Sequence, residues 1–447
     1  MRDWVNLDKN YIWHPFTQMK DWLESDNLII ERGDGVYLFD TNGNRYLDGI
    51  SSLWVNIHGH RKRAIDEAII NQIHKLSHST LLGLGATPSI ELAEKLVKIT
   101  PDNLSKVFFS DSGSTAVEVA LKIAFQYWKN KGCENKKLFV SLDQAYHGDT
   151  IGSVSVGAID TFHSIFHPLL FHTLVIPTPF PYRNPEFTPD ELKDNCLDNF
   201  RKIASERGSE IAALIVEPCV QGAAGMIVHP KGFLKGLETI CRENDILLIC
   251  DEVATGFGRT GTMFACEHEE VQPDLMCLAK GLTGGYLPLA ATLVSNKIFE
   301  AFLANHTEYK TFFHGHSYTG NALACAAAIA CLDIFDRDQV LERLDPKIKF
   351  LRDCLAGRLA NLDNVGDIRQ CGFMVGIELV QDKISRKPFP AELRIGATVT
   401  QNVRKYGVIL RPLGDVIVIM PPLSINTAEI DKIVSATHKS IQETCKL

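Results

Sequence analysis

The chain has 447 residues, with 46 Lys and Arg against 54 Asp and Glu and a formal net charge of −8. This length exceeds what one hydrophobic core usually organises, so we expect about two domains. The negative charge and the lack of a basic run argue against nucleic acid or an anionic membrane surface as a partner.

Cysteine usage and the lack of targeting signals predict a cytoplasmic protein. Twelve cysteines are scattered along the chain without a C-x-x-C pair, which is typical of reduced, mostly buried thiols. The start, Met1-Arg2-Asp3-Trp4, lacks the apolar core of a signal peptide. The longest stretch of small apolar residues, 322–334, contains Asp333 and is shorter than the ~20 residues that a bilayer span needs.

Short apolar strands alternate with amphipathic helical patterns through the middle of the chain. The clearest strands are residues 138–140, 211–216, 246–251 and 289–294. This alternation predicts an α/β fold with a mostly parallel sheet and helices on both faces, spanning residues 61–335.

The last part of the chain has a different pattern. A long polar helix beginning near residue 347 is followed by strands at 373–379, 408–410 and 416–420. This mixture predicts a separate, smaller α/β domain over residues 336–447.

A candidate phosphate site lies between a predicted strand, 106–109, and a predicted helix. Apolar residues recur on one face of that helix, at Val117, Leu121, Ala124, Phe125 and Trp128. A glycine and hydroxyl residues at a helix start direct free backbone N–H groups and the positive dipole end at an anion, so Gly113 and Ser114 are candidate phosphate ligands. An ordinary Ser or Thr N-cap explains this segment equally well.

Asp251 ends an unbroken apolar run that predicts a strand buried on both faces. In open α/β sheets, ligands bind beyond the carboxyl ends of the strands. An ionised Asp at that place can hold a pyridine nitrogen protonated, which makes the ring withdraw electrons. A helix N-cap or a buried ion pair is an equal alternative for this residue alone.

Lys280 follows Cys277-Leu278-Ala279 and precedes the glycine-rich stretch 281–285. Its small neighbours leave the amine exposed to a ligand, and such a lysine can form a Schiff base. Together with a carboxylate for a pyridinium nitrogen and an anion site for a phosphate, Lys280 meets the needs of an electron-sink cofactor.

Several separated motifs resemble the class III pyridoxal-phosphate aminotransferases. In chain order they are Ser112-Gly113-Ser114, Tyr146-His147-Gly148, Glu217-Pro218, the segment 251–259 and Lys280. The resemblance covers essentially the whole chain. It implies the fold type I architecture, pyridoxal 5′-phosphate as cofactor, and a homodimer in which two subunits share each active site. The N-terminal segment, residues 1–60, would then join the small C-terminal domain.

The resemblance also implies a role for each matching residue that faces the cofactor. Lys280 would be the Schiff-base lysine and would then carry a proton between the substrate's Cα and the cofactor's C4′ carbon. Asp251 would pair the ring nitrogen, and Gly113 and Ser114 would bind the phosphate. Tyr146 would stack on the ring and line the substrate pocket.

Five further residues receive roles from the same resemblance. His316 and Ser317 would reach the phosphate from the partner subunit, while Trp54 and Gly315 would contact the substrate. Arg411 would bind the substrate's carboxylate, because a planar guanidinium can donate two parallel hydrogen bonds to a carboxylate. Without the resemblance, Arg411 could equally be a surface ion-pair partner.

Other segments are similar to one branch of the family, the biotin-pathway aminotransferases that convert 8-amino-7-oxononanoate to 7,8-diaminononanoate. These segments are 13–18, 51–54 with 58–60, 411–414 and 420–422. Many members of this branch carry Tyr in place of Phe16 and a Trp pair in place of Leu53-Trp54. Those aromatic residues help to hold S-adenosylmethionine. Another branch of the family uses lysine, and the segment Phe16-Thr17-Gln18 with His316-Ser317 resembles that branch, so the amino donor is expected to be S-adenosylmethionine or lysine.

Three other motifs in the chain do not support a different function. The segment 256–261 matches G-x-G-x-x-G, but residues 262–268 are too few before Pro273 for the helix that a dinucleotide site needs. The pairs His58/His60 and His314/His316 lack a third ligand at hydrolase spacing, so no metal is expected. Residues 315–320 are one position off a nucleophile elbow and follow no suitable strand.

Two alternatives concern relatives with the same fold. A non-catalytic relative would be expected to lack Lys280 or Asp251, and this chain has both. Class III aminotransferases that act on other ω-amino acids would keep both residues but need not carry the segment 13–18 or Arg411-Pro412.

Overall fold

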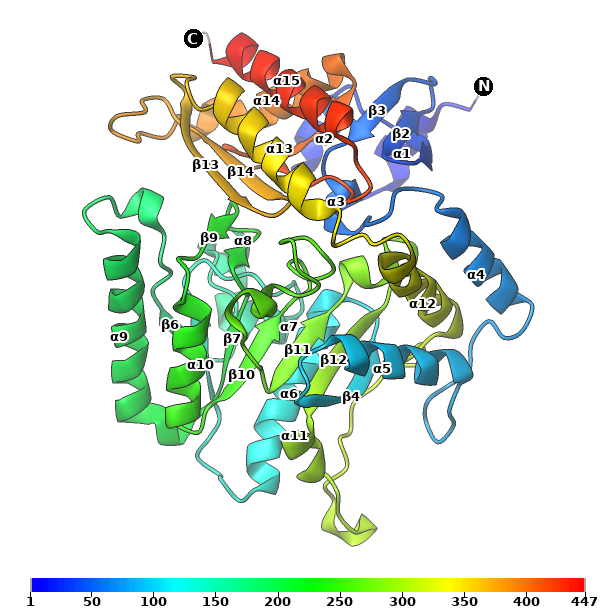
Figure 1. Cartoon of the computed structure of the whole chain (residues 1–447), viewed down its shortest axis with the longest axis vertical. Coiled ribbons are helices and arrows are strands. Elements are labelled where there is room, and N and C mark those ends of the chain that lie inside the picture. The colour runs from blue at the N-terminus through cyan, green and yellow to red at the C-terminus, as the bar shows by residue number, and fades with distance from the viewer. Residues whose placement is uncertain (1, 446–447) are drawn as a thin grey trace.

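The computed structural model describes residues 2–445 and has a mixed α/β fold (Figure 1). Its largest sheet has the strand order β4 (Leu104–Ser110), β12 (Ala290–Ser295), β11 (Leu275–Leu278), β10 (Leu247–Asp251), β7 (Ile211–Val216), β5 (Leu138–Leu142) and β6 (Thr173–Ile176). From β11 to β6 all neighbouring strands are parallel, so the predicted mostly parallel sheet is confirmed.

Strand β12 is the exception to the parallel pattern. It pairs antiparallel with both β11 and β4. Only residues 279–289 connect β11 to β12, which is too short for the helical crossover that a parallel pair requires. The antiparallel return places this short connection, which begins with Ala279 and Lys280, at the carboxyl end of β11.

The central strands are buried on both faces. In β10, Leu248 and Cys250 pack into one hydrophobic cluster, whereas Leu247 and Ile249 pack into another. Helix α6 (Gly113–Asn130) covers the second face, while α9 (Pro189–Arg207) and α10 (Phe233–Glu243) lie on the first. Because side chains alternate between faces along a strand, a strand buried on both sides must be apolar at every position.

Two smaller sheets lie beyond the carboxyl ends of these strands (Figure 1). One is antiparallel, with the order β13 (Val365–Cys371), β14 (Met374–Leu379), β17 (Val416–Ile419) and β16 (Arg411–Leu413). The other joins β1 (Ile30–Asp34), β2 (Tyr37–Asp40) and β3 (Arg45–Asp48) to β15 (Val408–Ile409). Strand β3 pairs in parallel with β15, so the N-terminal strands are hydrogen-bonded to the C-terminal part of the chain.

The expected strand 408–410 is shorter in the structure, because Leu410 lies between β15 of one sheet and β16 of another. Arg411 is therefore the first residue of a strand instead of lying just after one. Its Cα partner across the sheet is Val418.

The remaining elements are helices and a short hairpin. They are α1 (Trp4–Tyr11), α2 (Met19–Glu24), α3 (Ser51–Trp54), α4 (Arg63–Ile73), α5 (Thr87–Ile99), α7 (Ile151–Ser155), α8 (Asp160–His163), β8 (Val220–Gln221), β9 (Ile227–Val228), α11 (Asn296–Glu300), α12 (Ala322–Arg337), α13 (Leu344–Arg358), α14 (Ile395–Asn402), α15 (Thr427–Thr444) and the 3-10 turns η1 (Ser164–Leu169), η2 (Pro181–Arg183), η3 (Gly208–Glu210), η4 (Ala265–Glu269), η5 (Lys280–Thr283), η6 (His306–Glu308), η7 (Ala391–Leu393) and η8 (Val403–Tyr406). Within residues 2–445, no helix combines the length and the apolar character that a bilayer crossing requires.

Candidate active site

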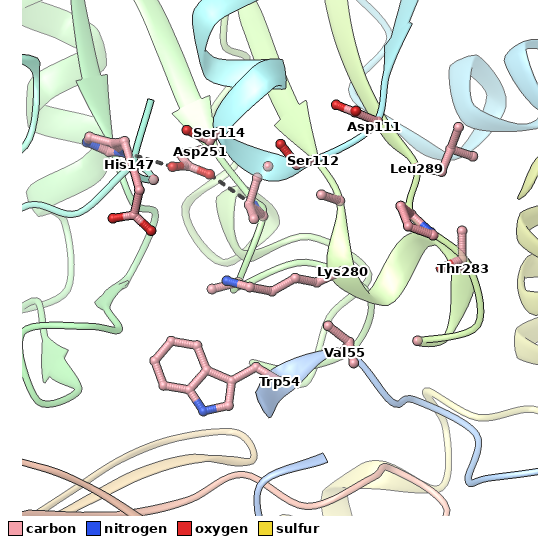
Figure 2. A pocket seen from close by; sticks show the side chains of 18 of the residues that line it. Trp54, Val55, Asp111, Ser112, Ser114, His147, Asp251, Lys280, Thr283 and Leu289 are labelled. Atoms are coloured by element: carbon pink, nitrogen blue, oxygen red, sulfur yellow. Dashed lines mark hydrogen bonds and ion pairs between the residues drawn. The ribbon is translucent and has the colours of Figure 1, made fainter. Parts of the chain in front are cut away.

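A cavity of about 670 Å³ lies between the large sheet and the smaller sheets (Figure 2). Residues from six parts of the chain line it: the turn that carries Trp54, the start of α6, the loop after β5, the segment after β7, the end of β10, and the connection from β11 to β12. The predicted residues Gly113, Ser114, Tyr146, Asp251 and Lys280 all line this cavity, together with Trp54.

Lys280 extends across the cavity between Asp251 and Trp54 (Figure 2). Its Nζ lies 5.2 Å from the centroid of the Trp54 indole. Its backbone has φ 45°, a left-handed conformation that is uncommon for a non-glycine residue. Burial lowers the pKa of the Lys280 ammonium, while the carboxylates of Asp251 and Glu217 oppose this shift. A lowered pKa raises the fraction of neutral amine, the form that attacks carbonyl groups.

Asp251 is fixed at the end of β10 by two hydrogen bonds. Its Oδ1 accepts from the backbone N–H of Val253 at 3.1 Å, and its Oδ2 lies 2.7 Å from Nδ1 of His147. Because a carboxylate only accepts, Nδ1 of His147 carries the proton and donates. The Asp251 side chain is only 5% exposed, so this carboxylate is held in one orientation facing the cavity.

Two buried residues of the site, His147 and Glu217, were not predicted. His147 lines the cavity behind Asp251, and its Nε2 is buried without a hydrogen-bond partner among the described residues. Glu217 accepts from the backbone N–H groups of Tyr146 at 3.2 Å and Gly222 at 2.9 Å. Burial raises the pKa of Glu217 to about 7. The only sequence signal for either residue was its place in a family motif.

The start of α6, where the sequence predicts an anion site, lines the cavity. Ser112 caps the helix by accepting from Thr115 N, and the first-turn N–H groups of Gly113 and Ser114 have no acceptor within the helix. A Cβ at Gly113 would lie 2.5 Å from a methyl carbon of Val253, so a larger residue does not fit. The hydroxyl of Ser114 bonds to Thr150, accepting from its backbone N–H at 3.0 Å. An anion would therefore meet the backbone of Ser114, while its hydroxyl shapes the loop.

Arg411 is not among the cavity-lining residues, but it lies near Tyr146, which lines the cavity. The Tyr146 hydroxyl donates to Asp149 Oδ2 at 2.8 Å, and burial raises the pKa of Tyr146. Burial lowers the pKa of Arg411, an effect that the neighbouring Tyr146 opposes. Among residues 2–445, the Arg411 side chain has no hydrogen-bond partner and no ion-pair partner, although its backbone belongs to the sheet. Its guanidinium is half-buried, and the N–H groups are available to bind a ligand.

The register of β16 shows which way Arg411 faces. Arg411 is paired with Val418, which packs in one cluster with Trp54. Directly paired residues of antiparallel strands project from the same face of the sheet. Arg411 therefore lies on the same face of its sheet as the cluster that contains Trp54.

The loop that contains the other predicted residues lies outside the cavity of its own chain. His316 Nε2 is 3.9 Å from Asp111 Oδ1, and Asp111 lines the cavity. Gly315 and Ser317 are not among the cavity-lining residues, and the Ser317 carbonyl accepts from His78 at 2.7 Å. Within one chain, these three residues are not brought together with Lys280.

The N-terminal segment approaches the cavity through aromatic contacts. Phe16 packs edge-on against Phe162 with ring centroids 5.5 Å apart, and Phe162 lies 6.3 Å from Tyr146. The segment 13–18 is thus connected to the cavity wall by one intervening ring.

The groups that line the cavity match those that a phosphorylated pyridine aldehyde needs. The cavity combines a buried carboxylate for a ring nitrogen, a lysine amine with a lowered pKa, and a helix start for a phosphate. No group of three or more His, Cys, Asp and Glu side chains within residues 2–445 is arranged to hold a metal ion.

Named relatives are similar to this chain over nearly its whole length. An adenosylmethionine-8-amino-7-oxononanoate aminotransferase from Anoxybacillus flavithermus is 52% identical, and the match covers 99% of this chain and 97% of the relative. The relative of the same name from Staphylococcus aureus is 49% identical, with 98% of each chain covered.

Solved structures are also similar to this chain over nearly its whole length. The adenosylmethionine-8-amino-7-oxononanoate aminotransferase of Methanocaldococcus jannaschii has a TM-score of 0.94 at 47% identity, covering 99% of both chains. An amine transaminase from an uncultivated Pseudomonas species, in its PLP-bound form, has a TM-score of 0.93 at 36% identity, covering 97% of this chain and 99% of that one. The family model described as Aminotransferase class-III matches residues 21–441. The chain belongs to the class III aminotransferases.

Proposed function

We propose that this protein is a pyridoxal 5′-phosphate-dependent aminotransferase that converts 8-amino-7-oxononanoate to 7,8-diaminononanoate in biotin biosynthesis. The observation that carries this proposal is the 52% identity over 99% of the chain to a relative named for that reaction. The cavity adds chemical support, since it brings together a lysine, a buried Asp and a helix start. A direct test is the appearance of 7,8-diaminononanoate, measured by mass spectrometry, when the purified protein receives the oxononanoate and an amino donor.

The cofactor supplies an electron sink for the bond electrons of the reacting carbon. Lys280 is proposed to hold it covalently and then, as a free amine, to move the proton at the substrate's Cα. Its lowered pKa suits this task, because a larger fraction of the amine is then in the neutral form that can accept a proton. Asp251, held by His147 at 2.7 Å, would keep the ring nitrogen protonated.

Gly113 and Ser114 are proposed to bind the phosphate through their backbone N–H groups, which point from the start of α6. Tyr146 would cover the ring and line the substrate pocket. In this division of roles, the Ser114 hydroxyl orders the loop at Thr150 and does not itself carry the charge.

We propose a homodimer in which His316 and Ser317 of one chain reach the phosphate of the other, with Gly315 close to its substrate. Support comes from exposed apolar side chains around this loop, where Tyr309 and Phe313 are each 75% exposed and Leu82 is 81% exposed. Apolar groups gathered on a surface favour burial by another protein surface. Light scattering of the purified protein tests this, and a monomeric mass would contradict it.

Arg411 is proposed to bind the carboxylate of the oxononanoate, and Trp54 to pack against its hydrocarbon chain. The guanidinium lies on the Trp54 face of its sheet and has no ion-pair partner among residues 2–445. A long substrate with a terminal carboxylate and an apolar chain matches this combination of a free cation and an indole.

Replacement of Arg411 by alanine is expected to raise the KM for the oxononanoate roughly 30- to 1,000-fold, equivalent to about 2–4 kcal/mol for the loss of a charge-assisted pair. The half-reaction that loads the cofactor with the donor's amino group should proceed at nearly its original rate. Single-turnover absorbance measurements of the two half-reactions separate these effects. Arg411→Lys is the matched control, which keeps the charge without the planar fork and should be intermediate. Equal damage to both half-reactions would contradict this role.

The donor is proposed to be S-adenosylmethionine or lysine. Phe16, at the outer end of the aromatic contacts with Phe162 and Tyr146, stands where many members of this branch carry a tyrosine. Incubation with ¹⁵N-labelled lysine or ¹⁵N-labelled S-adenosylmethionine identifies the donor by the label in the product. If neither labels the product but another ω-amino acid does, the donor specificity is that of a different branch of the family.

We further propose that the chain functions in the cytoplasm and divides into an N-terminal segment, 1–60, a large domain, 61–335, and a small domain, 336–447. The pairing of β3 with β15 supports the assignment of the N-terminal segment to the small domain.

A further inference from the structure

The turn that carries Trp54 has a left-handed backbone. Four successive residues have positive φ: Ser51 at 49°, Ser52 at 41°, Leu53 at 67° and Trp54 at 70°. The Trp54 N–H donates to the Ile50 carbonyl at 2.7 Å, which closes a left-handed helical turn. Side chains of L-amino acids crowd the following carbonyl in this conformation, so it persists only where the surroundings impose it.

Asp48 imposes the conformation of this turn. Its Oδ1 accepts from the backbone N–H of Ile50 at 3.3 Å and of Ser52 at 2.9 Å. Its Oδ2 accepts from the Ser52 hydroxyl at 2.8 Å and lies 3.0 Å from His60 Nε2. The side chain of Asp48 is completely buried. One carboxylate thus holds the first half of the turn through several donors.

His60 is itself held in one tautomer by Asn56. The Asn56 Oδ1 accepts from Gly59 N–H at 2.7 Å, which leaves the amide nitrogen to donate to His60 Nδ1 at 3.1 Å. Since Nδ1 then accepts, Nε2 carries the proton and donates to Asp48. Each member of this network has a partner, so the orientation of the Asp48 carboxylate is uniquely determined.

The other side of the turn is hydrogen-bonded to the chain just after β17, the strand that pairs with Arg411. The Ser51 hydroxyl donates to the Met420 carbonyl at 2.6 Å, and Met420 and Val418 pack in one cluster with Trp54. Val418 is the strand partner of Arg411. The turn therefore sets the position of the indole relative to both Arg411 and Lys280.

We propose that Asp48 and His60 are positioning residues that determine acceptor specificity by holding the left-handed turn, and with it the Trp54 indole, in place. This inference rests on the proposed function, in which the indole packs against the acceptor's hydrocarbon chain. Neither Asp48 nor His60 lines the cavity, so their effect is transmitted through the turn.

Asp48→Asn tests the proposal, because asparagine has only one acceptor oxygen. That oxygen can replace either Oδ1, which accepts from the backbone N–H groups of Ile50 and Ser52, or Oδ2, which accepts from Ser52 Oγ and His60 Nε2, but not both. The expected result is an increase of about 10-fold in the KM for the oxononanoate, as misplacement of a contact group by a fraction of an ångström would produce. The donor half-reaction and the cofactor's visible absorbance should change less than about 2-fold. Ser52→Ala, which removes only one hydroxyl, should give the same pattern at about 3-fold and carries the test if Asp48→Asn does not fold.

Glycine provides a rescue that is specific to a left-handed turn. Adding Ser52→Gly and Leu53→Gly to Asp48→Asn should bring the KM to within about 3-fold of the original value, because glycine adopts positive φ without strain. Asp40→Asn is the matched control. Asp40 also ends a strand of the same sheet, is buried, and accepts from the backbone N–H groups of Asn42 and Asn44, but it does not contact the turn. Asp40→Asn should leave the acceptor KM unchanged.

A spectroscopic measurement separates this inference from the proposed function. In protein labelled with 5-fluorotryptophan, the ¹⁹F resonance of Trp54 is assigned by its loss in Trp54→Phe. It should shift or broaden in Asp48→Asn, return in the glycine-rescued variant, and stay in place in Asp40→Asn. A resonance unchanged in Asp48→Asn, equal damage to both half-reactions, or failure of the glycine rescue would overturn the inference. If the original protein does not convert the oxononanoate but the resonance behaves as expected, the proposed function fails and the positioning role stands.

Discussion

Replacement of Lys280 by alanine is expected to lower the rate of amino transfer by at least ~10⁴-fold, because one change removes both the covalent attachment and the proton-transferring amine. The expectation follows from the structure around this residue. Its amine lies in the cavity, has a pKa lowered by burial, and faces Asp251 and Glu217. The rate is measured as single-turnover formation of product with the variant saturated in cofactor.

The same residue gives a direct chemical readout. The original protein should be yellow, and borohydride should fix the cofactor to the peptide that contains Lys280, as detected by mass spectrometry. Lys280→Arg is the control, since it keeps a cation at this place but cannot bond to the cofactor. Borohydride labelling of a different lysine, or a protein that stays colourless in pyridoxal phosphate, would show that Lys280 is not the attachment residue.

Replacement of Asp251 by asparagine should lower turnover by about 10²–10³-fold, the range measured when one preorganised electrostatic contact is removed from an active site. A neutral amide cannot stabilise a protonated ring nitrogen as an anion does, so the cofactor withdraws electrons less strongly. Both half-reactions should slow equally, since both need the same electron sink. Much of the cofactor binding should remain, because the start of α6 is untouched.

His147→Gln is the companion variant to Asp251→Asn. It removes the 2.7 Å contact that orients the Asp251 carboxylate but leaves the charge in place. Its effect should therefore be smaller than that of Asp251→Asn, and the two changes combined should cost little more than Asp251→Asn alone. Near-normal turnover of Asp251→Asn would contradict the proposed role of this carboxylate.

The sequence by itself determined the strands, the residues at their ends and the family. Apolar runs without alternation predicted strands buried on both faces, and the positions of Asp251 and Lys280 at strand ends predicted their place at the carboxyl edge of the sheet. These features depend on local patterns of burial, which a sequence records directly. Gly113, Ser114, Tyr146, Asp251 and Lys280, which those patterns and motifs single out, all line one cavity.

Only the tertiary structure decided which side chains converge. The antiparallel return of β12, the contact of His147 with Asp251, and the use of the Ser114 hydroxyl at Thr150 depend on strand order and on contacts between distant segments. The left-handed turn of Ser51–Trp54 contains no glycine that could have indicated it in the sequence. Asp48 and His60 cause this conformation instead. Such a conformation is unfavourable locally, at about 1–2 kcal/mol per residue, so no local propensity predicts it. The stabilisation comes from the buried Asp48 carboxylate, which His60 orients, and from the hydrogen bond of Ser51 to the distant Met420, and this arrangement exists only in the folded chain.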